Sequence, residues 1–455
     1  MKRDATNALL RRSDITLPTF DLSTVQGKAG YRARLDRLRA TVAATGEAAQ
    51  TVAQIIDDVR REGDEAVVRY MRKWTDPNFT ADRIRVTTEE LDVAERSLDP
   101  ELREALRLAI DNVRAYQTHV RPRDPEPIEI NGARLGMRFT PVDSVGLAVP
   151  GGKAAYPSSV IMLAIPAQAA GVDPASISVV TPPPTRQGDE PTRDIAPLVL
   201  AACRLCGIER VYRIGGAQAI AALALGTQTV QRVDMIVGPG NLYTQLAKQQ
   251  LAGTVGIDGF YGPSEIVTIT DETANPTRVA ADLIAQAEHD PGKCFLVAWS
   301  AAVIDAVQRE IARQLNERAR RAAIEAALRD ESCALLVADE AQAVEVANEL
   351  AAEHVNLAVR DPQSLLAKLR HGGEFFLGDQ TPVAAGDYLA GPSHSLPTGT
   401  TARFSSGISA YTFLKRSGTV EYPRGMDERT ISAIARLAEA EGLDGHAASA
   451  HVRRS

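Results

Sequence analysis

The chain has 455 residues, a length that predicts about two to four domains and a large buried core. Its net charge is −7 and no basic cluster of the nucleic-acid-binding type is present, so binding to polyanions is disfavoured. No apolar run is long enough to span a membrane, and the first residues do not read as a secretory leader. We therefore expect a soluble, cytoplasmic protein that performs chemistry on a small molecule.

The four cysteines predict no disulfide framework. They are Cys203, Cys206, Cys294 and Cys333, too few to staple a chain of this size and typical of reduced thiols in a cytosolic protein. Cys203 and Cys206 form a CxxC motif, but it lies in an apolar, helix-like run without a second such motif or a nearby histidine. Buried thiols are therefore favoured over zinc or redox chemistry.

The first part of the chain predicts helices. Residues 1–40 are polar, rich in arginine and without a clear period, so we expect an arm that another part of the protein holds in place. From 46 to 118 the apolar residues recur at helical spacing, as in Val52, Ile55 and Val59. This stretch is predicted to be a helical lead-in.

Beyond residue 128 the pattern changes to short apolar strands separated by glycine and proline. Four such strands run into turns, and the last two continue into helices; they lie in 144–152, 177–184, 210–224 and 233–251. Alternating strands and helices predict an α/β fold with a doubly wound parallel sheet, whose ligands collect at the carboxyl ends of the strands.

Two glycine-rich turns are candidates for ligand contact. Gly215-Gly216 and Gly238-Pro239-Gly240 would allow the backbone to approach a bound group, and Gln218 and Asn241, at the starts of the following helices, could hydrogen-bond it. The standard GxGxxG fingerprint of dinucleotide-binding domains is missing. Ordinary tight turns therefore remain an alternative to a nucleotide or phosphate site.

A QxxH motif lies at the end of a predicted helix. Asn275-Pro276 predicts the start of this helix, as an N-cap followed by proline at the first position, and Asp290-Pro291-Gly292 predicts its end. Gln286 and His289 are then on one face of the last turn and could hold a metal ion. A hydrogen-bonded polar pair is the alternative.

A second α/β unit follows the QxxH helix. Its strands are predicted near 293–300, 333–339 and 355–361, with helical residues between them. Glu353-His354 falls where the last helix meets the last strand, and an adjacent acid and imidazole can act as a general base and its partner. The alternative is a solvated pair at a capped helix end.

The last hundred residues add further candidates. Residues 374–407 are dense in Gly, Pro, Ser and Thr and predict a long irregular loop, which is usually functional and here carries Asp387 and His394. An amphipathic helix then ends at Gly442, near Glu441 and His446. Taken singly, Asp387 could be a loop-capping carboxylate, and Glu441 and His446 could be exposed residues of the tail.

Taken together and in order, these motifs resemble those of the histidinol dehydrogenase family, over roughly residues 40–451. The motifs are VPGGKAAYPSS (149–159), GGAQAIAALA (215–224), VGPGN (237–241), GPSE (262–265), QAEHDP (286–291), AxEH (351–354), GDYxAGPxHxLPTxxTARFSSG (386–407) and EGLxxH (441–446). Each is weakly specific alone, and their shared order is the signal.

The resemblance implies a set of site residues. One zinc ion per subunit would be held by Gln286, His289, Asp387 and His446, donors that suit this borderline-soft metal. The same four residues would line the substrate pocket together with Ser264, His354, His394 and Glu441. NAD would contact Gln218 and Asn241, and the catalytic pair would be Glu353 and His354.

The resemblance also implies the reaction and the architecture. The reaction is the oxidation of L-histidinol through L-histidinal to L-histidine in two NAD-dependent steps, the last of histidine biosynthesis, with His354 taking the alcohol proton and Glu353 activating water. The architecture is an intertwined homodimer with two Rossmann-like domains. We expect an N-terminal arm (1–40), a catalytic, zinc-bearing domain (41–148 plus 262–407), a second Rossmann-like domain (149–261) and a C-terminal helical segment exchanged with the partner (408–455).

Four positions depart from the family pattern. Ala148 replaces the tyrosine that commonly packs on NAD, and Tyr261 precedes GPSE where a small residue is usual, so that its ring could partly replace the missing one. Asn356 and Ser393 also differ from the commoner EHLEL and PNHVLP patterns. All of the metal and acid–base positions are kept, so we interpret these changes as sequence variation within the same fold.

Two other functions stay open. A paralogous zinc and NAD alcohol dehydrogenase acting on another small alcohol, such as a sulfopropanediol, should replace the region of Glu441 with groups for an anion, and the glutamate argues against it. A non-catalytic NAD- or metal-binding protein would have no reason to keep Glu353 and His354 beside a complete set of metal ligands.

Overall fold

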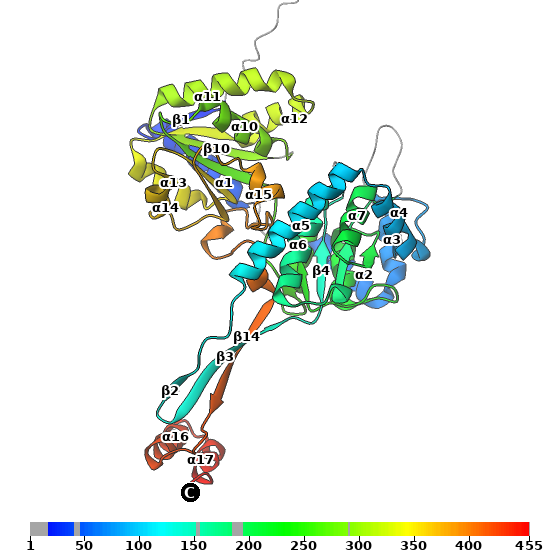
Figure 1. Ribbon diagram of the computed structural model, residues 1–455, viewed down its shortest axis with the longest axis vertical. Coiled ribbons are helices and arrows are strands. Elements are labelled where there is room, and N and C mark those ends of the chain that lie inside the picture. The colour runs from blue at the N-terminus through cyan, green and yellow to red at the C-terminus, as the bar shows by residue number, and fades with distance from the viewer. Residues whose placement is uncertain (1–16, 41–45, 152–154, 184–193, 290–291, 455) are drawn as a thin grey trace, which may run out of the picture.

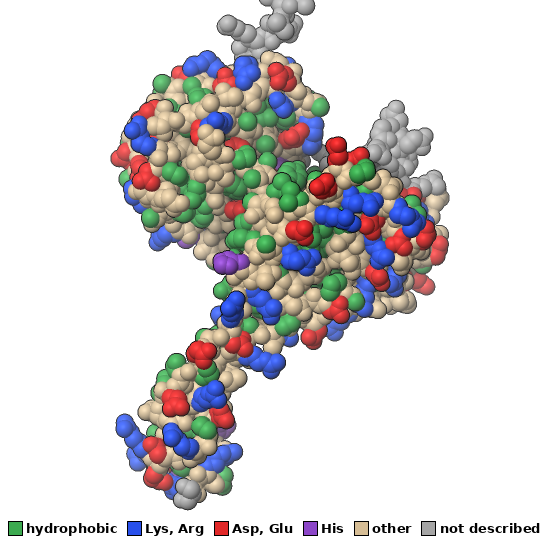
Figure 2. All heavy atoms as spheres, viewed as in Figure 1, with side chains coloured by type: hydrophobic (Ala, Val, Ile, Leu, Met, Phe, Trp, Pro, Cys, Tyr) green, Lys and Arg blue, Asp and Glu red, His purple; other side chains and the backbone are tan. Residues whose placement is uncertain are grey.

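The computed structural model describes residues 17–40, 46–151, 155–183, 194–289 and 292–454. Figure 1 shows two α/β domains side by side, from which a long antiparallel ribbon projects to a small helical module at the C-terminus. Acidic and basic side chains are mixed on the face that Figure 2 displays. In the described residues, no helix is long and apolar enough to cross a membrane.

The first domain is built on a five-stranded parallel sheet with the order β6-β5-β4-β7-β8. Its central strands are buried along their whole length, as both faces of a parallel sheet are covered by helices. The strands are β4 (Val145–Ala148), β5 (Ile177–Val180), β6 (Arg210–Tyr212), β7 (Met235–Val237) and β8 (Gly256–Ile257), and the connecting helices are α6 (Pro157–Ala170), α7 (Pro197–Leu205), α8 (Gly216–Leu225) and α9 (Leu242–Leu251).

The helical lead-in belongs to this first domain. Helix α2 packs against α8 and α9, α4 against α7, and α5 against α6. The apolar stripe that begins with Val52 and Ile55 is buried with Ile220 of α8. These helices are α2 (Glu47–Glu62), α3 (Asp64–Trp74), α4 (Thr88–Arg96) and α5 (Pro100–Val120).

This packing corrects the expected division of the chain. The expected division groups 41–148 with 262–407, but the described helices of 46–120 pack on the sheet formed by residues 145–257, and β4 is the central strand of that sheet. The reason is that amphipathic spacing identifies the buried face of a helix without identifying the sheet that covers it.

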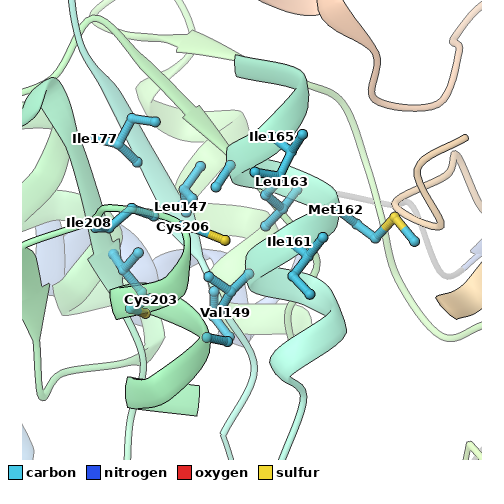
Figure 3. Packing of buried hydrophobic residues seen from close by; sticks show 14 of the residues in the cluster. Leu147, Val149, Ile161, Met162, Leu163, Ile165, Ile177, Cys203, Cys206 and Ile208 are labelled. Atoms are coloured by element: carbon cyan, nitrogen blue, oxygen red, sulfur yellow. The ribbon is translucent and has the colours of Figure 1, made fainter. Parts of the chain in front are cut away.

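The core of the first domain buries the CxxC motif. Figure 3 shows Cys203 and Cys206 among Leu147, Ile161 and Ile177, and both thiols are free. Burial raises the pKa of Cys206 to about 12, so the thiol stays protonated and unreactive. The remaining two cysteines are also free and buried, which confirms the expectation of buried thiols.

The second domain contains a six-stranded parallel sheet with the order β1-β11-β10-β9-β12-β13. Three of its strands were not predicted: β1, which lies in the expected N-terminal arm, β9, and β13, which opens the stretch expected to be an irregular loop. The strands are β1 (Thr19–Asp21), β9 (Glu265–Thr270), β10 (Lys293–Ala298), β11 (Cys333–Leu336), β12 (His354–Ala358) and β13 (Glu374–Leu377), and the helices are α10 (Pro276–Ala287), α11 (Ala301–Gln314), α12 (Arg321–Ala326), α13 (Glu340–Leu350), α14 (Pro362–Leu366) and α15 (Ala384–Tyr388).

The described part of the N-terminal arm is held by this second domain. Strand β1 pairs with β11 at the edge of the sheet, and α1 (Val25–Ala40) follows it. The side chains of Tyr31 and Arg32 bind Glu349 of α13, at 2.9 and 2.8 Å. Residues 1–16 lie outside the described residues.

The projecting ribbon consists of three antiparallel strands, β2 (Ile128–Ile130), β3 (Ala133–Pro141) and β14 (Leu414–Glu421). It ends in α16 (Glu428–Ala440) and α17 (Asp444–His451), which pack against each other. The buried apolar cluster of this helical module is only three alanines, Ala435, Ala438 and Ala447. The C-terminal segment thus has very little core of its own.

Candidate active site

The candidate acid–base pair lies at the amino edge of the six-stranded sheet. Strand β12 begins at His354, and in the register of the sheet this residue pairs with Glu374 of β13 and Ile266 of β9. Helix α10 ends immediately before β10 and so brings Gln286 to the same edge. These candidate residues therefore lie at the edge opposite the carboxyl ends of the strands, where ligands of parallel sheets are expected to collect.

A chain of hydrogen bonds joins Gln286 to Glu353. The side-chain amide of Gln286 donates from Nε2 to Ser264 Oγ at 2.6 Å, and Ser264 donates to Glu353 Oε2. The backbone N–H of Glu265 donates to the same oxygen at 2.9 Å. Glu353 is therefore buried and held by two donors, and is not the solvated helix-end residue of the alternative interpretation.

The hydrogen bonds of His354 define which ring nitrogen can act as a base. Its Nδ1 lies 3.3 Å from the carbonyl oxygen of Glu265 and 3.5 Å from Glu353 Oε2. A carbonyl oxygen only accepts, so Nδ1 carries the hydrogen and Nε2 carries the lone pair. Among the described residues Nε2 has no hydrogen-bond partner, and it lies 3.8 Å from Asp387 Oδ1.

Burial sets the charge of this pair. It lowers the pKa of His354 to about 4, so the imidazole is neutral near pH 7. Burial also raises the pKa of Glu353 well above its usual value, against the effect of its two donors. The neutral imidazole has a lone pair with which it can accept a proton.

Asp387 and two further histidines, His289 and His394, lie near His354. Asp387 and His289 both affect the pKa of His354 and that of His394, which burial lowers. The Nε2 atom of His394 is also buried without a hydrogen-bond partner in the described chain. Helix α10 starts as predicted, with Asn275 capping it, but it ends at Ala287, so His289 lies just past the helix and not in its last turn.

Three predicted metal donors fit a metal ion chemically. His289 Nδ1 lies 3.2 Å from the carbonyl oxygen of Gln286, so it is the protonated nitrogen, and Nε2 is left for a metal. Gln286 donates through its Nε2, which leaves its amide oxygen as a ligand. Across the described residues, no group of three or more His, Cys, Asp or Glu side chains could hold a metal ion.

The fourth predicted donor does not reach this site within the chain. His446 lies on α17, and Glu441 caps α16, so both belong to the helical module at the far end of the ribbon (Figure 1). Both residues are exposed. His446 lines a pocket on this module with Met426, Ile434 and others.

A cleft lies at the carboxyl ends of the strands of the first domain, where the glycine turns were expected to gather. Its wall includes Asn241, whose side chain caps α9 by accepting from the Thr244 N–H at 3.1 Å. Gln218 does not line the cleft; it is buried behind Gly216, and its Nε2 lies 3.7 Å from Met71 Sδ. The lining residues are Ala148, Val149, Pro150, Gly151, Val180, Pro182, Gly215, Gly216, Ala219, Ile220, Pro239, Gly240, Asn241 and Thr244.

Two of the positions that depart from the family pattern, Ala148 and Tyr261, lie in different surroundings. Ala148 lines the cleft, so the tyrosine it replaces would have stood in the wall. Tyr261 is buried and does not line the cleft, and its hydroxyl donates to the carbonyl oxygen of Ser406 at 3.0 Å. The ring of Tyr261 therefore does not replace the missing one.

Sequence reasoning did not single out two further carboxyl groups beside the pair, those of the buried Glu265 and the half-buried Glu374. Burial raises the pKa of Glu265 to about 7 and that of Glu374 to about 8. Both residues open strands that pair with β12. The sequence signal that could have identified these two carboxyl groups is an acidic residue at the start of an apolar strand, and it is clearest for Glu265 in GPSE.

The fold and the site together define the class of protein: a two-domain α/β enzyme with a glycine-lined cleft in one domain and a buried glutamate–histidine pair in the other. A family model described as histidinol dehydrogenase matches residues 38–454. The chain belongs to the histidinol dehydrogenase family.

Individual relatives agree with this assignment. A histidinol dehydrogenase of Rhodopirellula baltica is 46% identical over 89% of this chain and 86% of its own length. One of Thermosynechococcus vestitus is 44% identical over 93% and 97%. A crystal structure of histidinol dehydrogenase from Elizabethkingia anophelis superposes with a TM-score of 0.86 at 30% identity, covering 96% of this chain and 98% of that one.

Proposed function

We propose that this protein oxidises L-histidinol through L-histidinal to L-histidine, with NAD as the hydride acceptor. Membership of the family supports the reaction. The single observation that supports a catalytic role for this chain is the state of His354, a buried, neutral imidazole with a free Nε2 lone pair beside Glu353. A non-catalytic protein would gain nothing from such a costly arrangement.

The geometry divides the work between the two residues. His354 takes the proton of the substrate hydroxyl on Nε2, while its Nδ1–H stays on the carbonyl oxygen of Glu265 and fixes the ring. Glu353 takes a proton from the water that hydrates the aldehyde. Its Oε2 is occupied by Ser264 and the Glu265 N–H, so Oε1 is the oxygen that faces this task.

Zinc would be held by Gln286, His289 and Asp387 of one subunit and by His446 of the partner subunit. The bound ion would supply a fixed positive charge that anchors the imidazole and amino nitrogens of the substrate. Ser264, His394 and the partner subunit's Glu441 would complete the substrate pocket. Gln286 links the two functions of the site, because its amide also orders the Ser264 hydroxyl that binds Glu353.

NAD would bind in the cleft of the first domain, which we propose to be Rossmann-like. The cleft lies at the carboxyl ends of the strands, at the start of α9, where such domains bind nucleotides. Asn241 would contact the cofactor directly from the cleft wall. Gln218 would act from behind Gly216.

We propose a homodimer in which the helical module of each chain packs on its partner. Three observations support this assembly: the buried apolar cluster of the module is three alanines, the ribbon exposes Ile128, Ile130 and Val420, and α17, which carries His446, lies at the far end of the ribbon from the other donors. The exchange would complete the metal site and cover the exposed apolar surface together.

The reaction is tested by the stoichiometry of NADH formation. We expect two NADH for each L-histidinol, loss of turnover on chelation and no turnover of a sulfopropanediol. The Glu353→Gln/His354→Asn double variant should be folded and inactive. Turnover of the sulfopropanediol alone would establish the paralogous dehydrogenase, and unchanged behaviour of the double variant would establish the non-catalytic protein.

The exchange is tested by subunit complementation. His446→Ala and His354→Ala chains with different tags are co-expressed, and the heterodimer is isolated on both tags. If His446 acts in the partner's site, one of the two sites is intact, and the heterodimer should keep about half of the wild-type activity. If His446 acts within its own chain, both sites are damaged and the heterodimer is as inactive as either homodimer.

A further inference from the structure

Lys248 of α9 and Asp258, just after β8, form an ion pair that is completely buried. Both side chains are 0% exposed and the two charged groups are in direct contact. Replacing a buried pair by well-packed apolar side chains is often neutral or stabilising, because desolvation offsets the attraction. A contribution to stability is therefore a weak explanation for this ion pair. Its contacts with the backbone indicate a different role.

Both residues bind the backbone of Gly238. Lys248 Nζ donates to the carbonyl oxygen of Gly238 at 2.9 Å, and Asp258 Oδ2 accepts from its N–H at 2.6 Å. Gly238 has a φ of +120°, and a Cβ at this position would lie 2.3 Å from the carbonyl oxygen of Ala148. The pair thus fixes both polar groups of a residue that only glycine can supply.

Gly238 opens the turn that forms part of the cleft. The next residues, Pro239, Gly240 and Asn241, line it, and Thr244 of α9 lines it one turn before Lys248. Because proline has no N–H, the turn has few other backbone donors with which to hold its shape. The position of this wall depends on the contacts of Gly238.

The same pair also holds the segment that crosses to the other domain. Asp258 Oδ1 accepts from the N–H of Gly259 at 2.8 Å, and Lys248 Nζ lies 5.2 Å from the centre of the Tyr261 ring. Gln245, also on α9, accepts from the N–H of Tyr261 at 3.1 Å. Three residues further on, this segment reaches Ser264, which binds Glu353.

We propose that Lys248 and Asp258 are positioning residues for the reaction: they fix the cofactor-binding turn at 238–240 in place against the segment that carries Ser264. The proposal rests on the proposed binding of NAD in this cleft. Neither side chain touches the substrate or the cofactor. Their effect is on where the cofactor lies relative to Glu353 and His354.

The test compares two double variants. Lys248→Met/Asp258→Leu replaces the pair by apolar side chains and removes both contacts with Gly238, whereas Lys248→Met/Asp258→Asn keeps an acceptor for its N–H. Asp64→Asn is the matched control, because Asp64 is a buried carboxylate of the same domain that binds Thr227 and Thr229 away from the cleft. Circular dichroism and thermal unfolding report the folded state of each protein.

The readout is the dissociation constant of NADH, measured by fluorescence without turnover, together with the KM for NAD and for histidinol. We expect the Met/Leu variant to weaken NADH binding and raise the KM for NAD by about tenfold or more, with a smaller change in the KM for histidinol. For both quantities, the Met/Asn variant should lie between the Met/Leu variant and the wild type. Asp64→Asn should have the dissociation constant of NADH and the KM for NAD of the wild type.

The outcomes separate the two proposals. If the wild-type protein binds no NADH, the proposed function of the cleft fails. If the wild type binds NADH and the double variants bind it equally well, the positioning role is overturned. Should the Met/Leu variant not fold, the nearly isosteric Met/Asn variant decides alone, since unchanged NADH binding in it would also overturn the role.

Discussion

Removing the charge of Asp282 should stabilise the protein at neutral pH without loss of activity. Asp282 lies on α10 and is buried. Its carboxyl oxygens accept from Asn356 Nδ2 at 3.0 Å and from the N–H of Val383 at 3.2 Å. It thereby joins the three elements that carry Gln286, His354 and Asp387.

The magnitude follows from its pKa. Burial raises the pKa of Asp282 from 3.8 to about 6, so between these values the folded state holds a proton that the unfolded chain has released. The free energy of unfolding therefore falls as the pH rises through this window, by about 3 kcal/mol in total above pH 6. Below pH 3.8 the carboxyl group is protonated in both states and the effect vanishes.

Asp282→Asn should remove this cost and keep both contacts. The Oδ1 of the new asparagine can still accept from the N–H of Val383. Asn356 Oδ1 has no hydrogen-bond partner among the residues the structure describes. If the Asn356 amide turns over, this oxygen can accept from the amide of the new asparagine. We expect the variant to gain about 1.5 kcal/mol at about pH 5 and about 3 kcal/mol at about pH 7.5. Urea unfolding at the two pH values, with NADH formation as a check on the site, measures both expectations.

The control is Asp282→Ala, which also removes the buried charge but leaves two donors without acceptors: it should be less stable than the wild type by about 2 kcal/mol at about pH 5 and by about 0.5 kcal/mol at about pH 7.5, where the wild type has itself lost stability. A gain for Asp282→Asn that is the same at both pH values, or a loss at neutral pH, would refute the reasoning from the pKa.

Other expectations concern the chemistry. His354→Asn should lower kcat for NADH formation by about 10² to 10⁴, with little change in the KM for histidinol, as steady-state kinetics will show. Glu353→Gln should slow the second oxidation more than the first, so the yield in single-turnover experiments should move from two NADH toward one. Chelation should abolish activity, zinc should restore it, and circular dichroism should stay unchanged throughout, because the described cores are built from apolar side chains and not around a metal.

Features that depend on a few neighbouring residues, such as a helix cap or the start of an apolar strand, could be predicted from the sequence. Asn275 caps α10 through a bond to the Thr277 N–H, as its position before proline indicates. The meeting of helix and strand at Glu353-His354 was also predicted, because the apolar strand that follows is distinct. These features depend on a few neighbours in the chain.

Features that depend on distant contacts were not predicted. The spacing of Val52 and Ile55 gave the buried face of α2 but not the domain that covers it. The role of Tyr261 was misjudged for the same reason, since its ring faces Lys248 and Ser406, residues that no local pattern connects to it. The amino-edge position of the acid–base pair likewise follows from the strand order of the sheet.

The pairing of β1 with β11 bears on how the chain folds as it is synthesised. All five strands of the first sheet come from residues 145–257, so this sheet can form early, whereas Thr19 must wait for Ala334. Until then the apolar side chains of α1, among them Leu35 and Leu38, have no surface to cover them. The β1–α1 segment thus leaves the ribosome long before its partner strand and is among the last to settle, so it is where a nascent chain of this protein most needs a chaperone.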